Sequence, residues 1–172
     1  MKKYLLVLVM AIILSGCGTT SQLNFYDETL STDLSDENLL GVSLDMSEDI
    51  LLEKVGKPDF ENSVEDPPTT YLIYGSSEDE YEFEFMIDDQ NKRVKRYFIR
   101  QEGYETARNI EVGSSVTELI AAYGDSYYER EDTGSQVIGF FDKENQVNME
   151  FSTSDNVVLS YIVIDTEMLQ KR

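Results

Sequence analysis

The chain has 172 residues, a formal net charge of -20 and no histidine. So acidic a chain is repelled by nucleic acid and by anionic lipid headgroups, and on this ground we exclude nucleic-acid binding. The lack of histidine excludes Ser-His-Asp and Cys-His nucleophilic machinery, and histidine metal sites with them.

A short basic segment, Met1 to Lys3, and an apolar run, Tyr4 to Leu14, open the chain. The run is shorter than the roughly 20 apolar residues of a membrane-spanning helix, and it has the length typical of a secretory signal peptide. It ends in Leu14-Ser15-Gly16-Cys17, which resembles the lipobox of bacterial lipoproteins. The resemblance implies that residues 1–16 are removed as a signal peptide and that diacylglycerol is attached to Cys17. The alternative is an uncleaved anchor helix with a chance cysteine.

Cys17 is the only cysteine, so an intrachain disulfide is impossible. The two acyl chains of diacylglycerol are enough to anchor a protein stably. We therefore expect the mature protein at the extracytoplasmic face of the cell membrane, whether the source is Gram-positive or Gram-negative. Because the charge of -20 includes Lys2 and Lys3, loss of the signal peptide leaves -22.

Residues 17–39 contain the lipidated cysteine and a stretch rich in Ser, Thr and Asp with scattered apolar residues. We interpret this stretch as a tether that lifts the domain off the membrane, with a short helix near Leu30 to Leu39. The remaining length suits one domain with a hydrophobic core.

The rest of the chain is interpreted as two repeats, residues 40–100 and 109–165, within one compact domain. Each repeat carries a helical pattern, Ser47 to Val55 in the first and Ser115 to Tyr123 in the second. The two serines are N-cap candidates. A glycine follows each helix, Gly56 and Gly124, and is expected to end it in the left-handed conformation.

Three strand-like runs then follow in each repeat, joined by short polar turns. The runs are Tyr71 to Tyr74, Tyr81 to Phe85, Val94 to Ile99, Val137 to Phe141, Val147 to Phe151 and Val158 to Val163. Short connections favour antiparallel meanders. The predicted fold class is α+β, with two tandem repeats of a helix plus a three-stranded antiparallel meander and both helices packed on one face of the sheet.

This pattern resembles the beta-lactamase inhibitor protein group and the SmpA/OmlA (BamE) class of small bacterial lipoproteins. The resemblance rests on a short strand, a helix and a closing glycine, at Val42 to Gly56 and again at Ile110 to Gly124, each followed by a meander. An acidic insertion, Glu61 to Thr70, departs from the pattern. The resemblance implies a protein that binds or assembles other proteins and is not an enzyme.

Alternation in the second strand of each repeat places its apolar residues under the helices: Tyr81, Phe83 and Phe85 in the first repeat and Val147, Met149 and Phe151 in the second. Glu82, Glu84 and Glu150 then project from the opposite face. The first and third strands are apolar on both sides, so this face should also carry tyrosines and phenylalanines, a composition that suits protein recognition. Alternatively, the tether covers it, or the two halves fold together over it.

Two other kinds of site are weighed and rejected. Glu82 and Glu84 could serve as a pair of acid-base carboxylates, but no cleft is visible in the sequence and a solvated strand face explains them. The turns Asp88 to Asn91 and Asp142 to Asn145 lack the EF-hand pattern, and turns stabilised by Asp and Asn side chains explain both. No catalytic residue, metal site or cofactor is therefore predicted.

The function predicted is that of a non-catalytic, membrane-anchored lipoprotein that binds another extracytoplasmic protein, in an assembly or regulatory role. The contacts are assigned to Glu82, Glu84 and Glu150, and the high negative charge favours a basic partner. The alternative is a sensing module for cations or for a cell-wall polymer.

Overall fold

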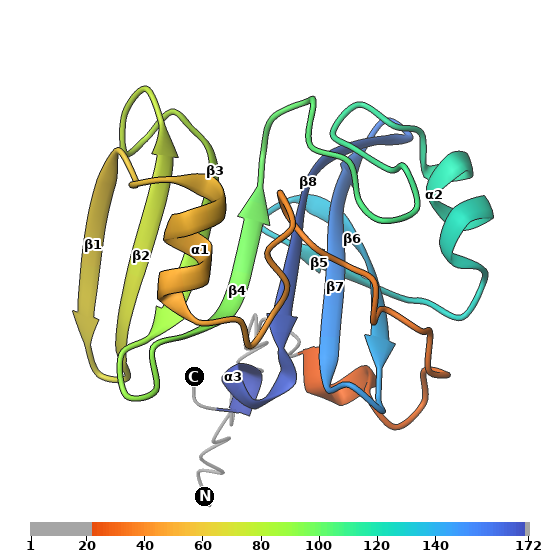
Figure 1. Cartoon of the computed structure of the whole chain (residues 1–172). Helices are drawn as coiled ribbons and strands as arrows, with labels where there is room; N and C mark the ends of the chain where they lie inside the picture. Colours follow the sequence, from red (N-terminus) through yellow and green to blue (C-terminus); the bar gives the residue numbers. More distant parts are fainter. Residues whose placement is uncertain (1–21, 171–172) are drawn as a thin grey trace, which may run out of the picture.

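The computed structural model describes residues 22–170; the predicted signal peptide and Cys17 lie outside the described residues. The elements are η1 (Gln22–Phe25, a 3-10 helix), α1 (Glu48–Val55), β1 (Phe60–Glu65), β2 (Pro68–Gly75), β3 (Tyr81–Asp88), β4 (Arg93–Ile99), α2 (Val116–Tyr123), β5 (Tyr128–Asp132), β6 (Ser135–Asp142), β7 (Val147–Ser154), β8 (Val157–Asp165) and α3 (Thr166–Gln170) (Figure 1). Within this part of the chain, no helix has the length and apolar character needed to cross a bilayer.

The eight strands form one antiparallel sheet in the order β1-β2-β3-β4-β8-β7-β6-β5. β4 and β8 join its two halves, with Tyr97 paired to Val163 and Ile99 to Tyr161. The predicted α+β fold of two helix plus three-strand repeats is therefore wrong. A single sheet dominates the structure, and the helices are short.

The two edge strands, β1 and β5, were missed by the prediction. All of β1 after Phe60 is exposed, and β5 fully buries only Tyr128. The segment interpreted as an acidic insertion is in fact β1, its turn and the start of β2, with Glu61 opposite Leu72. A strand that buries neither face carries no period-two apolar pattern, so its sequence resembles that of a loop.

The two predicted helices and their N-caps are confirmed. Ser47 and Ser115 each accept a hydrogen bond from the amide three residues on, and the Glu118 carboxylate accepts one from the Ser115 amide at 2.9 Å. Gly56 and Gly124 have φ values of 92° and 90°, as expected, but ψ values of -172° and -176°. They therefore lie in a backbone region open essentially to glycine alone, and not in the left-handed helical region.

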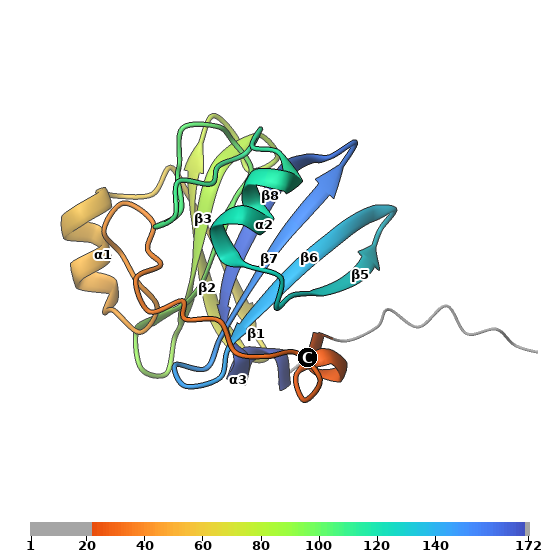
Figure 2. The same ribbon diagram turned by 90° about the vertical axis from the view of Figure 1, so that its right-hand side faces the viewer.

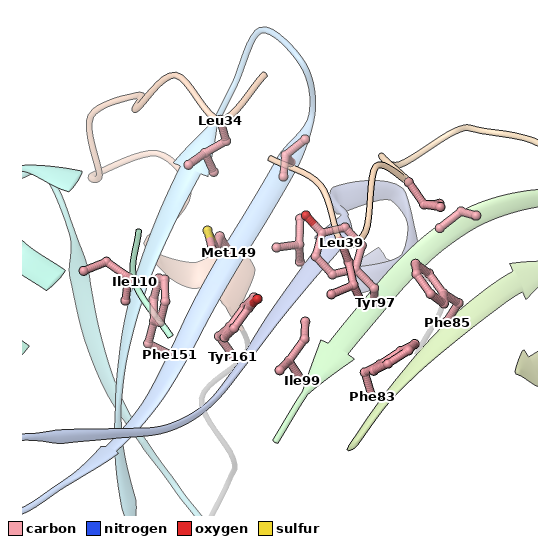
Figure 3. Close-up of a cluster of buried hydrophobic side chains, with 14 of the residues drawn as sticks. Leu34, Leu39, Phe83, Phe85, Tyr97, Ile99, Ile110, Met149, Phe151 and Tyr161 are labelled. Atoms are coloured by element: carbon pink, nitrogen blue, oxygen red, sulfur yellow. The ribbon is translucent and has the colours of Figure 1, made fainter. Parts of the chain in front are cut away.

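Helices α1 and α2 lie on the same side of the sheet (Figures 1 and 2). The main core fills the space between these helices and the strands, and it continues across the β4–β8 junction (Figure 3). Phe83 and Phe85 belong to it together with Leu51 of α1, and on the other half so do Phe151 and Tyr161. The prediction that Phe83 lies under the helices is confirmed.

The described part of the expected tether packs against the domain. Leu34 and Leu39 are buried in the main core, as Figure 3 shows, and the Leu34 amide donates a hydrogen bond to Asp142 Oδ2 at 2.9 Å. The helix expected near Leu30 to Leu39 does not form. Leu34 and Leu39 instead insert into the core one by one from an irregular segment that turns at residues 35–36 and 40–41.

Candidate functional site

The sheet face turned away from α1 and α2, here called the open face, carries one row of residues across four adjacent strands. Glu84 of β3 pairs with Phe98 of β4, Phe98 with Ile162 of β8, and Ile162 with Glu150 of β7. Phe98 and Ile162 are partly exposed. Two carboxylates thus stand at the ends of a central apolar pair.

The first carboxylate, Glu84, is ion-paired with Arg96 of β4. The two side chains are only 9% and 14% exposed. The Arg96 guanidinium also lies 5.3 Å from the ring centroid of Tyr71. Because the pair is largely desolvated, removing either member would leave a buried charge, which is strongly unfavourable.

The second carboxylate, Glu150, accepts three short hydrogen bonds. Arg130 of β5 binds it with two nitrogens, Nε to Oε1 at 2.8 Å and Nη2 to Oε2 at 2.7 Å, and the Tyr128 hydroxyl donates to Oε1 at 2.6 Å. The hydrogen bonds to Glu150 raise the pKa of Arg130, and burial raises the pKa of Tyr128. Arg130 therefore stays charged and Tyr128 stays protonated as the donor.

Glu82, the third predicted site residue, is only partly buried and accepts a hydrogen bond from the Tyr104 hydroxyl. Burial, together with this hydrogen bond, raises the pKa of Tyr104 to about 12. A register shift between β2 and β3 next to Gly75 alters the alternation here, and the ring of Tyr81 packs against Phe98 of the open face. The prediction that Tyr81 lies under the helices is therefore wrong.

The structure thus places Glu84 and Glu150 in one row and Glu82 beside Tyr104. Contact between a partner and these three glutamates stays a prediction. Sequence reasoning missed Arg96 and Arg130, which neutralise two of the three. Such an arginine could be recognised only by its side chain lying on the same sheet face as a glutamate of a nearby strand. This can be judged only when the strand order and register are known.

A cleft of about 280 Å³ lies on the open face beside the second ion pair. Apolar side chains, polar hydroxyls and a charged pair all line it: Phe98, Val137, Ile162, Ile164, Ser152, Ser160, Arg130 and Glu150. Gln22 of η1 and Leu169 of α3 contribute to its border. This arrangement can hold an apolar group against a floor whose charges are already paired.

The chain itself covers part of the open face. Phe25 stacks on Tyr128 of β5 with ring centroids 4.9 Å apart, and Tyr26 meets Phe141 of β6 edge-on at 5.1 Å. Cover by the N-terminal segment, one of the alternatives from the sequence, is therefore confirmed over β5 and β6. The row at the centre of the sheet remains accessible through Phe98 and Ile162.

The two acidic turns are stabilised by Asp and Asn side chains, as predicted from the sequence. Asp88 accepts hydrogen bonds from Gln90 and Asn91, and Asp142 accepts hydrogen bonds from the amides of Glu144 and Asn145. Across residues 22–170, no group of three or more Cys, Asp or Glu side chains is arranged to hold a metal ion.

No protein-family model and no curated protein matches the chain. An extracellular protein containing an SCP domain from Bacillus anthracis str. Ames has a similar fold, with a TM-score of 0.54 and 10% identity over 99% of this chain and 52% of that one. A cysteine-rich secretory protein from Staphylococcus aureus subsp. aureus Mu50 matches with a TM-score of 0.52 and 12% identity, over 77% and 48%. The chain spans about half the length of each, and the likeness concerns the fold alone.

A third structure, a proposed beta-lactamase inhibitor protein from Streptococcus mutans, matches with a TM-score of 0.32 and 11% identity over 86% of this chain and 99% of that one. That score is too low to support an argument about fold or function.

Proposed function

We propose that the protein is a non-catalytic extracytoplasmic lipoprotein that is anchored through Cys17 and binds another protein through the open face. The signal peptide and lipobox support the location. Two proteins with a similar fold are described as extracellular and secretory, which agrees with it.

The row Glu84–Phe98–Ile162–Glu150 is the observation that carries the proposal. Apolar side chains at the centre of a polar border are typical of protein interfaces. Arg96 and Arg130 already pair with the two carboxylates. A partner can therefore cover the apolar centre without burying an unpaired charge. In this role Glu84 and Glu150 shape the floor of the surface, whereas Glu82 is bonded to Tyr104, whose ring packs against Phe83 of the main core.

The charge of the chain indicates the kind of partner. The mature chain would carry -22, and its field attracts basic proteins. Such steering weakens as ionic strength rises, because the Debye length is only about 8 Å at physiological salt. We therefore expect capture of the partner to decrease with added salt.

Site-specific photocrosslinking in intact cells tests the proposal. A photoreactive amino acid at Ile162 should yield an adduct with one defined protein, whereas the same amino acid at Glu53, exposed on α1, should not. The variant Phe98→Ser should lose the Ile162 adduct while keeping a cooperative thermal melt. Identical adducts from both positions, or no adduct from Ile162, would contradict the proposal.

The anchor is tested separately. Cys17→Ser should abolish acyl labelling and leave an unlipidated precursor or a soluble secreted form. A variant that still accepts label and fractionates like the wild type would contradict lipidation. A rise in melting temperature on adding calcium would instead favour the alternative of a cation-binding module.

A further inference from the structure

We infer that the lipid anchor holds the domain with the end formed by η1 and α3 against the phospholipid surface and the opposite end away from it. This inference rests on the proposed lipidation of Cys17. It assigns the domain an orientation above the bilayer, which the anchor imposes although the acidic chain is itself repelled by anionic headgroups.

The first step is the attachment of η1 to the sheet. Phe25 stacks on Tyr128 with an interplanar angle of 10°, and Gln22 Nε2 donates a hydrogen bond to Glu150 Oε2 at 3.3 Å. Tyr26 contacts Phe141. Aromatic pairs of this kind stabilise the contact beyond the area they bury. The chain is therefore fixed to the domain from Gln22 onward.

The second step is the reach of the chain between anchor and domain. Cys17 precedes Gln22 by five residues. Even when fully extended, five residues span about 17 Å. The nine-residue β8 is longer, about 30 Å at roughly 3.3 Å per residue. An anchor of this length therefore keeps the η1 end of the sheet close to the lipid headgroups. It excludes the inverted orientation, in which the far ends of the strands would touch the headgroups and Gln22 would stand above them.

The third step is which parts of the domain share the end with η1. Figure 1 shows α3, the β3–β4 turn and the β6–β7 turn at this end, whereas the β2–β3 loop lies at the other. The two turns carry Lys92 and Lys143 beside Asp88, Asp89, Asp142 and Glu144, and Lys92 pairs with Asp89 at 2.7 Å. The β2–β3 loop carries Glu78 to Glu80, three consecutive exposed acidic residues. The loop is more acidic than either turn, but Asp27 and Glu28 follow η1 and α3 carries Glu167, so charge does not distinguish the two ends and the short tether alone sets the orientation.

A fluorescence experiment on the full lipidated protein tests the orientation. The Cys17 sulfur is consumed by the lipid, so a single introduced cysteine can be labelled selectively. Glu167→Cys on α3 and Asp79→Cys in the β2–β3 loop are matched variants, because both replace an exposed acidic residue. Each is reconstituted into phosphatidylethanolamine–phosphatidylglycerol vesicles that carry a nitroxide quencher on the headgroup.

We expect several-fold stronger quenching of the label at position 167 than at position 79. Equal quenching, or stronger quenching at position 79, would overturn the inference. A Gly/Ser insert of about 20 residues between Thr20 and Ser21 lengthens the reach, and it should remove most of the difference. A difference that survives the insert unchanged would show that the short tether does not set the orientation.

Two controls separate this inference from the proposed function. Acyl labelling of both cysteine variants reports lipidation independently of quenching. Crosslinking from Ile162 reports partner binding independently of orientation. If one proposal fails, the other can therefore still be tested.

Discussion

Tyr128 reaches across a whole strand to hydrogen-bond Glu150. Tyr128 is on β5 and Glu150 on β7, and both pair in register with Gly139 on the intervening β6. The phenol ring lies directly over Gly139, since a Cβ built on that glycine would be 2.1 Å from Tyr128 Cζ. The glycine inside this apolar strand therefore leaves room for the ring that completes the Glu150 network.

Gly139→Ala is therefore expected to destabilise the protein. The added methyl group collides with the Tyr128 ring, and overpacking of this kind costs roughly 1–3 kcal/mol. Chemical denaturation would measure the loss. In the background Tyr128→Ala, which removes the ring, the same substitution should cost much less, and an equal cost in both backgrounds would contradict the assigned contact.

Glu150→Ala is expected to cost up to about 3–5 kcal/mol, because the buried Arg130 would keep only the more exposed Asp132 as an ion-pair partner. Glu129→Ala, an exposed substitution on β5, is the matched control and should change stability by no more than about 0.5 kcal/mol. Equilibrium unfolding of both variants provides the comparison. Equal stability of the two would argue against a structural role for the ion pair.

Charge reversal at Glu84 should also unfold the domain, because Glu84→Lys places a second positive charge beside the buried Arg96. From the sequence alone, Glu82 and Glu84 are expected to be exposed, so that their joint charge reversal weakens partner capture and leaves the fold nearly intact. Glu82→Lys should destabilise the protein less, since Glu82 is only partly buried and its carboxylate accepts a hydrogen bond from the neutral Tyr104 hydroxyl. Thermal melts of the two single variants would distinguish these expectations.

Alanine at Gly56 or Gly124 is expected to destabilise the protein through the backbone alone. No atom lies within 4 Å of the position where either Cβ would be, so no packing is lost or crowded. The strain of their positive φ angles should cost about 1–3 kcal/mol at each site. Because the two sites are on different helices, the losses should add in the double variant. A variant as stable as the wild type would contradict the assigned angles.

Glu37 should make stability depend on pH. Its Oε1 accepts a hydrogen bond from the Tyr123 hydroxyl at 2.6 Å, yet burial raises the pKa of this carboxyl above 4.5. The folded protein thus binds this proton more tightly than the unfolded chain, so the contribution of Glu37 to stability falls as pH rises above about 4.5. Glu37→Gln removes that contribution.

The measurement is the difference in melting temperature between wild type and Glu37→Gln from pH 4 to pH 7. We expect the melting temperature of Glu37→Gln to rise relative to that of the wild type as pH increases. Other carboxylates, such as Asp89, titrate alike in both proteins and cancel in the difference. A difference that stays constant over this range would contradict a raised pKa.

Features set by neighbouring residues could be predicted from the sequence. The periodicity of Ser47 to Val55 and Ser115 to Tyr123 predicted both helices, because helix caps and apolar faces are local patterns. Alternation in β3 likewise placed Phe83 and Phe85 in the core. The apolar run before Cys17 predicted a signal peptide and a lipid anchor, and these stay predictions because they lie outside residues 22–170.

The tertiary structure alone decided which strands exist at the edges and how the acidic face is built. β1 and β5 are strands only because β2 and β6 supply their hydrogen bonds, so their own residues need no apolar pattern. Glu84 and Glu150 could not be recognised as buried from sequence, because Arg96 and Arg130 reach them from other strands. Period-two alternation assigns a side chain to a face, but its charge partner depends on strand order and register, which are set by contacts between residues far apart in the chain.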